Sequence, residues 1–307
     1  MFNVARIFAG HEILIFQVHS PSEIPNVIAV RGINRHVGTT FITANLALTL
    51  AQRGAKTLLL DLNLWNCDLT RCFGFEPTSA LIDLAQEMDA GNVLSIDSIA
   101  RYTKSCRPKL DLLPGTLRWL ETPTLRGENG WNLIHNFFVR APERWNTVIV
   151  DLGSHAPSAA QRDITFLISS AVHASVLQAA SFLIGVCDSI AYFKIWQAAP
   201  TQDSHFRDRS IYVVNKHSST LPLGLDRYMV DAKTRAQSFF IPSLQENMLA
   251  DGRGLLFAER NSQSDSLSGE QRQARRAFQD IATRVNRPST SQEVTDRFAK
   301  SFRNNNS

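Results

Sequence analysis

The sequence lacks the features that mark a membrane, secreted or nucleic-acid-binding protein. No apolar run in its 307 residues reaches the roughly 20 residues of a transmembrane helix, and the N-terminus lacks the basic-then-apolar layout of a signal peptide. The net charge of +4 comes without a dense block of Lys and Arg, so nucleic acid is not an expected partner. These absences predict a cytoplasmic protein.

Cysteine is also scarce, with Cys67, Cys72, Cys106 and Cys187 as the four examples. Cys67 and Cys72 are separated by four residues, and no second Cys or His pair follows at a zinc-like spacing. We interpret all four as reduced thiols, in keeping with the reducing cytosol.

Short apolar runs rich in Leu, Val and Ile alternate with helical stretches such as 39–54 and 157–171. The runs are too apolar to leave one face in water, which is typical of parallel strands covered by helices on both sides. This alternation predicts an α/β fold, a doubly wound and mostly parallel sheet of about seven or eight strands flanked by helices. The expected strands are 26–30, 56–62, 109–115, 146–153, 174–180, 210–216 and 237–242.

The chain is expected to form one main domain, residues 26–286, with two appendages. Residues 1–25 form a short N-terminal extension with one candidate strand, 12–18, and residues 287–307 form a polar C-terminal tail. No internal repeat and no second core are evident.

The tail has a short pattern of its own. Val294, Phe298 and Phe302 fall at helical spacing, with basic residues nearby. One interpretation is an amphipathic anchor for a membrane surface or a partner groove, and the other is a frayed or packed C-terminal helix.

The stretch from residue 27 to 63 predicts a strand, a short loop, a helix and a second strand that ends at Asp61. This is the layout of a phosphate-binding loop, in which backbone N–H groups and a helix N-terminus point at the anion. Such loops use glycines to fold tightly, a lysine to contact the outer phosphates and a Ser or Thr hydroxyl to ligate Mg²⁺. Here the loop reads "RGINRHVGTT" over residues 31–40, with no lysine and few glycines.

The loop, the helix text "NLA" at 45–47 and the later "VIVDLG" at 148–153 resemble the MinD/ParA family of deviant Walker-A ATPases, whose loop reads K-G-G-V-G-K-T-T. With "NLA" aligned, Val37, Gly38 and Thr40 match the family's valine, glycine and metal-binding threonine. The resemblance implies a P-loop NTPase-like fold with ATP and Mg²⁺ as its cofactors.

The same alignment exposes the departures from the family pattern. Asn34 stands where the signature lysine belongs, Arg35 and His36 replace two glycines, and Thr39 replaces the phosphate-gripping lysine. Asn63 takes the place of a carboxylate that the family links to hydrolysis. Losing such groups costs on the order of thousandfold in rate.

Other family positions are retained along nearly the whole chain, about residues 26 to 286. The resemblance places Asp61 and Asp151 at the two conserved carboxylate positions and Asn215 where the family reads adenine; further similar text runs at 73–84, 110–115, 239–242 and 248–259. It implies a Mg²⁺ site, retained or vestigial, made by Thr40, Asp61 and Asp151. The implied nucleotide-binding residues, equally retained or vestigial, are Gly32, Asn34, Arg35, Val37, Gly38, Thr39, Thr40 and Asn215.

Purely structural roles for these residues also stay open. In this alternative, Thr40 is an early-helix residue that hydrogen-bonds the backbone, Asp61 and Asp151 cap strand ends, and Asn215 serves a turn. Arg31 is another candidate cation, interpreted here as a solvated residue at a strand end.

The threonine in place of the second lysine makes the loop resemble two groups of proteins within the family. The text "VRG…VGTTFITANLA" resembles the BcsQ (YhjQ) proteins of cellulose secretion, whereas 73–77 and 241–242 resemble the CpaE/TadZ proteins of Tad pilus assembly. The resemblance implies a cytoplasmic accessory or scaffold for an envelope export machine, with protein partners there and a homodimer as one form. Any membrane contact would be peripheral, at the inner membrane or the cell pole.

Two rival functions remain at this point. One is an ATP-dependent dimerisation switch in which Arg35 stands in for lysine, and the other is a ParA-like DNA partitioning factor. The modest net charge argues against the DNA-binding alternative.

Overall fold

The computed structural model describes most of the predicted core and not every loop. The described residues are 3–9, 12–18, 26–33, 36–64, 66–91, 93–116, 125, 127–154, 172–173, 175–177, 179–188, 209–217, 238–244 and 268–286. Two predicted loop residues, Asn34 and Arg35, lie outside this set, as do the expected helix 157–171, the text 248–259 and the tail 287–307.

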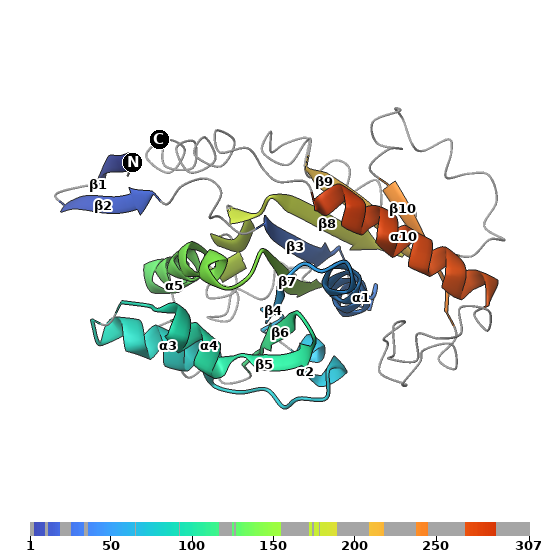
Figure 1. Cartoon of the computed structure of the whole chain (residues 1–307), viewed down its shortest axis with the longest axis horizontal. Helices are drawn as coiled ribbons and strands as arrows, with labels where there is room; N and C mark the ends of the chain where they lie inside the picture. The colour runs from blue at the N-terminus through green and yellow to red at the C-terminus, as the bar shows by residue number, and fades with distance from the viewer. Residues whose placement is uncertain are drawn as a thin grey trace, which may run out of the picture.

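The main sheet has eight strands in the order β10-β9-β8-β3-β7-β4-β6-β5 (Figure 1). Every neighbouring pair is parallel except the edge pair β5 and β6, which is antiparallel. The α/β fold with about eight mostly parallel strands is therefore confirmed. The strands are β3 (Asn26–Gly32), β4 (Thr57–Asp61), β5 (Lys104–Arg107), β6 (Leu110–Leu113), β7 (Thr147–Ser154), β8 (Phe182–Cys187), β9 (Ser210–His217) and β10 (Ser238–Pro242).

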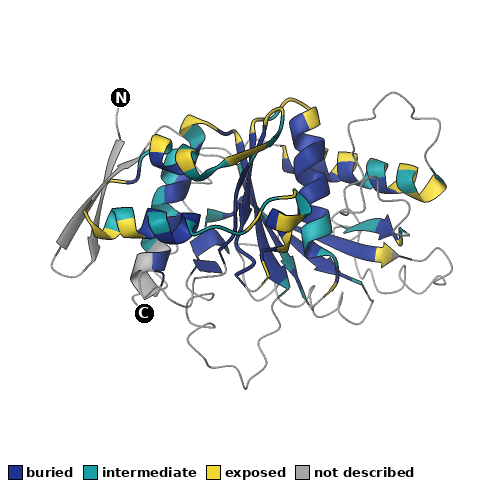
Figure 2. Cartoon of the chain, turned by 90° about the horizontal axis from the view of Figure 1, so that it is seen from below, coloured by how far each residue is buried: buried dark blue, intermediate teal, exposed yellow. Residues whose placement is uncertain are grey.

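Helices cover both faces of this sheet, as the views in Figures 1 and 2 show. α1 and α10 lie on one face and contact each other, while α3, α4 and α5 pack on the other face. The described helices are α1 (Thr39–Gln52), α2 (Asp68–Cys72), α3 (Ala80–Asp89), α4 (Ile96–Tyr102), α5 (Gly127–Arg140), the 3₁₀ turn η4 (Ala141–Glu143) and α10 (Gly269–Val285). Of these described helices, none combines the length and the apolarity needed to span a bilayer.

Strand alternation explains how two cores share one sheet. In β3, Val27 and Ala29 belong to the cluster under α5, and Ile28 and Val30 to the cluster under α1. Because both faces are buried, the strand must be apolar at every position, which is the pattern that the sequence shows. Each fully buried aliphatic side chain of this kind contributes about 1.5–3 kcal/mol, so the central strands form a rigid base for the loops at their ends.

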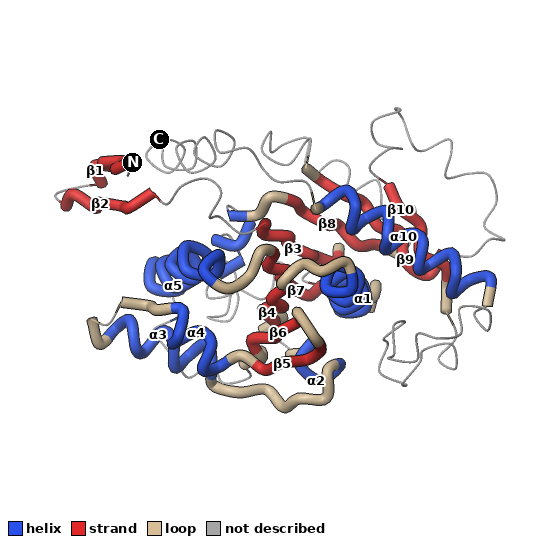
Figure 3. Tube along the Cα trace, in the orientation of Figure 1, coloured by secondary structure: helices blue, strands red, loops and turns tan. Residues whose placement is uncertain are grey.

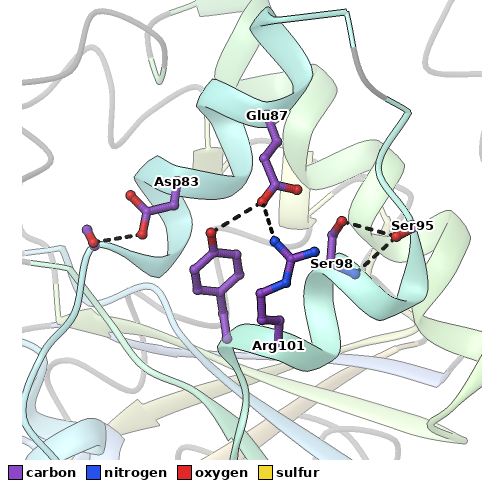
Figure 4. A network of polar contacts seen from close by, with 7 residues as sticks. Asp83, Glu87, Ser95, Ser98 and Arg101 are labelled. Atoms are coloured by element: carbon purple, nitrogen blue, oxygen red, sulfur yellow. Dashed lines mark hydrogen bonds and ion pairs between the residues drawn. The ribbon is translucent and has the colours of Figure 1, made fainter.

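The cover formed by α3 and α4 is joined by a small polar network (Figure 4). Glu87 Oε1 accepts hydrogen bonds from the guanidinium of Arg101, at 3.1 Å, and from the hydroxyl of Tyr102, at 3.3 Å. Ser95 caps α4, because its hydroxyl accepts from the Ser98 N–H at 3.0 Å. An exposed ion pair such as Arg101–Glu87 adds about 1 kcal/mol at most. The network therefore contributes little to the stability of the fold compared with the apolar packing of the two helices.

One predicted strand is wrong. Residues 175–177, inside the expected strand 174–180, are helical, and the strand is β8, which begins at Phe182. Val172, Val176 and Ala180 are all buried and recur every four residues, which is the spacing of one helix face. The glycine in "FLIGVC" lowers the strand propensity of the segment that is a strand.

The N-terminal candidate strand is confirmed as β2 (Glu12–Val18). It pairs antiparallel with β1 (Asn3–Ala9) in a two-stranded sheet of its own, which the sequence pattern did not predict (Figure 3). The remaining predicted strands match the main sheet to within a few residues at their ends.

Candidate functional site

The candidate site lies where β3 gives way to α1, at the carboxyl ends of the central parallel strands. β3 is flanked by β7 and β8, and β7 separates it from β4, the next strand in the chain. The carboxyl ends of β3, β4 and β7 therefore lie at one edge of the sheet. In open α/β sheets this is the edge at which ligands bind.

Gly38 starts α1 and is required there for two reasons. It is in the left-handed region, with φ of 88°, and a Cβ at this position would lie 2.2 Å from Nδ2 of Asn215. The helix begins without a side-chain cap, so its first turn presents backbone N–H groups and the positive end of the helix dipole to the loop.

Thr40 and Thr39 are neighbours in sequence but contact different groups. The Thr40 hydroxyl donates to Oδ2 of Asp151 at 2.7 Å. Thr39 is only 4% exposed, and its hydroxyl lies 2.9 Å from that of Ser154, with which it shares a hydrogen bond. The residue at the family's lysine position is thus turned into the protein.

Ser154 was missed in the sequence interpretation. It ends β7 and is the register partner of Gly32 on β3, so strand pairing brings its hydroxyl to the start of α1. Its position three residues after Asp151, at the end of a buried strand, was the only available signal.

Asp61 ends β4, and its register partner Asp151 lies on the neighbouring strand β7, three residues before the end of that strand. Asp61 Oδ2 accepts from the backbone N–H of Thr70, at 2.8 Å, and from its hydroxyl, at 2.6 Å. Asp151 Oδ1 accepts from the Gly153 N–H at 2.8 Å, in addition to the Thr40 bond. Thr70, at the third position of α2, was another residue that the sequence gave no reason to select.

Burial controls the acid–base behaviour of both carboxyl groups. Desolvation raises the pKa of Asp61 above its ordinary value, although the Thr70 hydrogen bonds oppose the shift. Desolvation also raises the pKa of Asp151, and the charge of Asp61 raises it further. Two carboxylates buried side by side are therefore costly unless a proton or a cation compensates them.

The oxygen donors at this position fit Mg²⁺. The Thr40 hydroxyl and the Asp151 carboxylate are 2.7 Å apart, and the Asp61 carboxylate lies on the adjacent strand. Mg²⁺ prefers one or two carboxylates with waters and phosphate oxygens as its remaining ligands. Within the described ranges, no group of three or more His, Cys, Asp or Glu side chains could hold a metal by itself.

Asn63 is buried against the backbone that follows Asp151. A Cβ on Gly153 would lie 2.7 Å from the amide carbon of Asn63, so the two residues are in close contact. Its backbone N–H donates to Oδ1 of Asp61 at 3.3 Å. An amide at this position cannot accept a proton as a carboxylate does.

Asn215 and Lys216, at the end of β9, hold the loop from the other side. Asn215 is buried, and its amide donates to the Val37 carbonyl at 2.8 Å. Lys216 donates from Nζ to the His36 carbonyl at 2.5 Å, a contact that the sequence interpretation missed. Asn215 lies within a strand, so the turn role considered for it is wrong.

Two further residues near the site are affected by burial. Arg31 lies near the end of β3 as expected, but it is half-buried, and burial lowers the pKa of its guanidinium. Cys67 is buried beside Asp61, and desolvation raises the pKa of its thiol to about 12. A thiol with so high a pKa is a poor nucleophile and a poor metal ligand at neutral pH.

Comparison with known proteins places the fold. No family model and no curated protein matches the sequence. Among solved structures, a ParA family ATPase from Chlorobium tepidum is similar at a TM-score of 0.60 and 19% identity, covering 84% of this chain and 98% of that one. MinD from Pyrococcus horikoshii in complex with Mg-ADP gives 0.57 and 15%, with 86% and 97% covered.

A third similar structure is the MinC:MinD cell division complex from Aquifex aeolicus, with a TM-score of 0.58, 15% identity, and 85% of this chain and 95% of that one covered. Identities this low establish a shared fold and leave activity open. The chain has the fold of the MinD and ParA P-loop ATPases.

Proposed function

We propose that this chain is a degenerate MinD/ParA-like protein that keeps the metal side of a nucleotide site and has lost efficient ATP hydrolysis. It acts as a cytoplasmic accessory or scaffold of a bacterial envelope export machine, for cellulose secretion or a Tad pilus. One observation carries the proposal. Position 39 holds a buried threonine bonded to Ser154, whereas Thr40 and Asp151 keep their mutual contact.

The loss of hydrolysis follows from the groups that the site contains. Thr39 carries no charge and its hydroxyl is engaged by Ser154, so it cannot neutralise the charge that develops on the outer phosphates. Asn63, which contacts Gly153 of β7, has an amide where a carboxylate would be needed. Each missing group costs on the order of a hundredfold to a thousandfold in rate, and the two losses act on the same step.

Retention of binding follows from the rest of the site. Mg²⁺, when bound, would neutralise phosphate charge, and Thr40, Asp151 and Asp61 are the residues that would hold it directly or through water. The first turn of α1 offers backbone N–H groups to a phosphate, and Gly38 lets the chain pass close to it. These groups support binding of a Mg-nucleotide, with affinity reduced by the missing lysines.

The export role is supported by the resemblance of the loop text "VGTTFITANLA" to the BcsQ proteins and of other segments to CpaE/TadZ. The MinD of Aquifex aeolicus is solved with a protein partner, MinC, which is the type of interaction we propose for this chain. A homodimer and a peripheral association with the inner membrane or the cell pole are parts of the same proposal.

The export role is tested in the source organism by deleting the gene and scoring cellulose export and pilus assembly. Loss of one of the two, restored by the Thr40→Ala variant as well as by the wild type, is the result expected of a scaffold that needs no turnover. Intact export and intact pili in the deletion strain contradict the proposal.

The second candidate is an ATP-dependent dimerisation switch, and the intact Thr40–Asp151 contact beside Asp61 favours it. Isothermal titration with Mg-ATP, together with the molar mass in solution, separates the two functions. Binding accompanied by a doubling of mass supports the switch. Absence of heat at high micromolar ATP excludes it and leaves the scaffold.

A further inference from the structure

Lys216 forms an unusual contact with the loop. Its Nζ lies 2.5 Å from the carbonyl oxygen of His36, a residue 180 positions away in the chain. Both residues are in the left-handed region, Lys216 with φ of 57° and His36 with φ of 62°. A non-glycine residue in this region costs about 1–3 kcal/mol, so the surrounding structure holds both ends of the contact in place.

Lys216 acts together with Asn215. Asn215 donates to the carbonyl of Val37, so two consecutive residues of β9 hold two consecutive carbonyls of the loop. No peptide bond in the described chain is cis. In a trans peptide the C=O and the N–H point in opposite directions. Because the carbonyls of His36 and Val37 point at β9, the N–H groups of Val37 and Gly38 point away from it.

These two N–H groups are next to the first turn of α1, which begins at Thr39. Successive N–H groups beside a helix N-terminus form a concave site for an anion. Hydrogen bonding to a carbonyl also polarises the N–H of the same peptide, and a charged donor does so more strongly than a neutral one. The hydrogen bond from Lys216 to the His36 carbonyl therefore polarises the N–H of Val37.

We propose that Lys216 is a positioning residue for a phosphate-bearing ligand. It fixes and polarises the loop peptides, and so compensates in part for the lysine that Thr39 replaces. The inference rests on the proposed retention of the nucleotide site, and it depends neither on the loss of hydrolysis nor on the export role. The ligand chemistry is a phosphate chain, supplied by a nucleoside triphosphate or by a free polyphosphate.

The test compares Lys216→Met with Lys216→Arg and wild type, by titration of the full chain with Mg-ATP, magnesium tripolyphosphate and adenosine. Lys109→Met is the matched control. Lys109 is also exposed and also has a left-handed backbone, with φ of 64°. It lies far from the loop, in the turn between β5 and β6 at the opposite end of the sheet. In Lys216→Met, affinity for both phosphate ligands should fall about tenfold, the loss of one hydrogen bond with a charged partner. Lys216→Arg should keep most of the affinity, and adenosine affinity should not change.

Exchange of the Val37 and Gly38 amide hydrogens should quicken in Lys216→Met, while the melting temperature stays near that of Lys109→Met. Unchanged ATP and tripolyphosphate affinity in Lys216→Met overturns the inference, and so does an equal loss for adenosine, which would point to the base. Tripolyphosphate binding without ATP binding identifies the free polyphosphate as the ligand. If the wild type binds neither phosphate ligand, the inference fails while the scaffold function stands.

Discussion

The candidate site has a metal side, made by Thr40, Asp61 and Asp151, and a phosphate side, made by Thr39 and the loop residues 36–38. The two sides differ in how far they keep the residues of the MinD/ParA pattern. On the metal side, Thr40 still donates to Asp151, and Asp61 lies beside it on the next strand. On the phosphate side, Thr39 is turned inward onto Ser154, and the contacts to the loop come from β9. The difference shows that the phosphate side can lack the family's lysines while the fold persists, because Ser154, Asn215 and Lys216 hold this part of the chain through hydrogen bonds.

The same comparison explains the buried carboxylates. Asp61 and Asp151 satisfy their oxygens with Thr70, Thr40 and Gly153, yet burial still raises the pKa of both. A proton or a bound cation can compensate two such groups, so both protonation and Mg²⁺ should change the stability of this side of the site.

The largest loss of stability is expected at Gly38, which lies between the loop and the first turn of α1. Gly38→Ala should lower the free energy of unfolding by about 3 kcal/mol, because the left-handed φ is strained for alanine and the Cβ would meet the Asn215 amide at 2.2 Å. Chemical denaturation measures the change. Gly91→Ala is the control, since Gly91 shares the left-handed φ, at 81°, but has open space around it and should lose only about 1–2 kcal/mol. Equal losses in the two variants would show that the Asn215 contact does not constrain the loop.

Removing each threonine hydroxyl compares the two sides directly. Thr40→Val should lower the free energy of unfolding by about 1.5–3 kcal/mol, because it removes a hydrogen bond to a carboxyl group, and Thr39→Val by about 1 kcal/mol, because its partner is neutral. Addition of Mg²⁺ should raise the melting temperature of Thr39→Val and not that of Thr40→Val. The reverse order of the two losses, or Mg²⁺ stabilisation of both variants, contradicts the assignment of the two sides.

A smaller effect is expected from pH. The folded protein keeps protons on its raised carboxyl groups at pH values where the unfolded chain, with an ordinary carboxyl pKa of 3.8, has released them. Because the native state then binds more protons, the free energy of unfolding should fall as the pH rises from the ordinary carboxyl range toward neutrality. Asp151→Asn should remove much of this dependence and stabilise the protein at neutral pH by about 1–2 kcal/mol.

Asp89→Asn, at the exposed end of α3, is the matched control for the pH experiment and should keep the wild-type profile. Denaturation at several pH values from about 4 to 7.5 spans the expected window. A stability that rises across this window and is unaffected by Asp151→Asn would show that the buried carboxyl groups do not control it.

Apolar patterning was sufficient to predict most of the sheet, because strands buried on both faces, such as "TVIVD" in β7, leave few alternatives. It failed for β8, because the glycine in "FLIGVC" weakens the strand signal there and the preceding helical run is also apolar. The strand was therefore predicted at 174–180, before its actual start at Phe182. The resemblance identified Thr40, Asp61, Asp151 and Asn215 from local text. Ser154, Thr70 and Lys216 have no local signature, since each reaches the site only through pairing or packing of distant segments.

Steady-state ATP hydrolysis by the full chain, measured beside its Thr40→Ala variant, tests the central claim most directly. The variant removes the Thr40 hydroxyl and with it the metal side of the site. We expect the wild-type rate in Mg-ATP to be no higher than that of the variant. Sustained turnover by the wild type that Thr40→Ala abolishes would contradict the claim that hydrolysis has been lost.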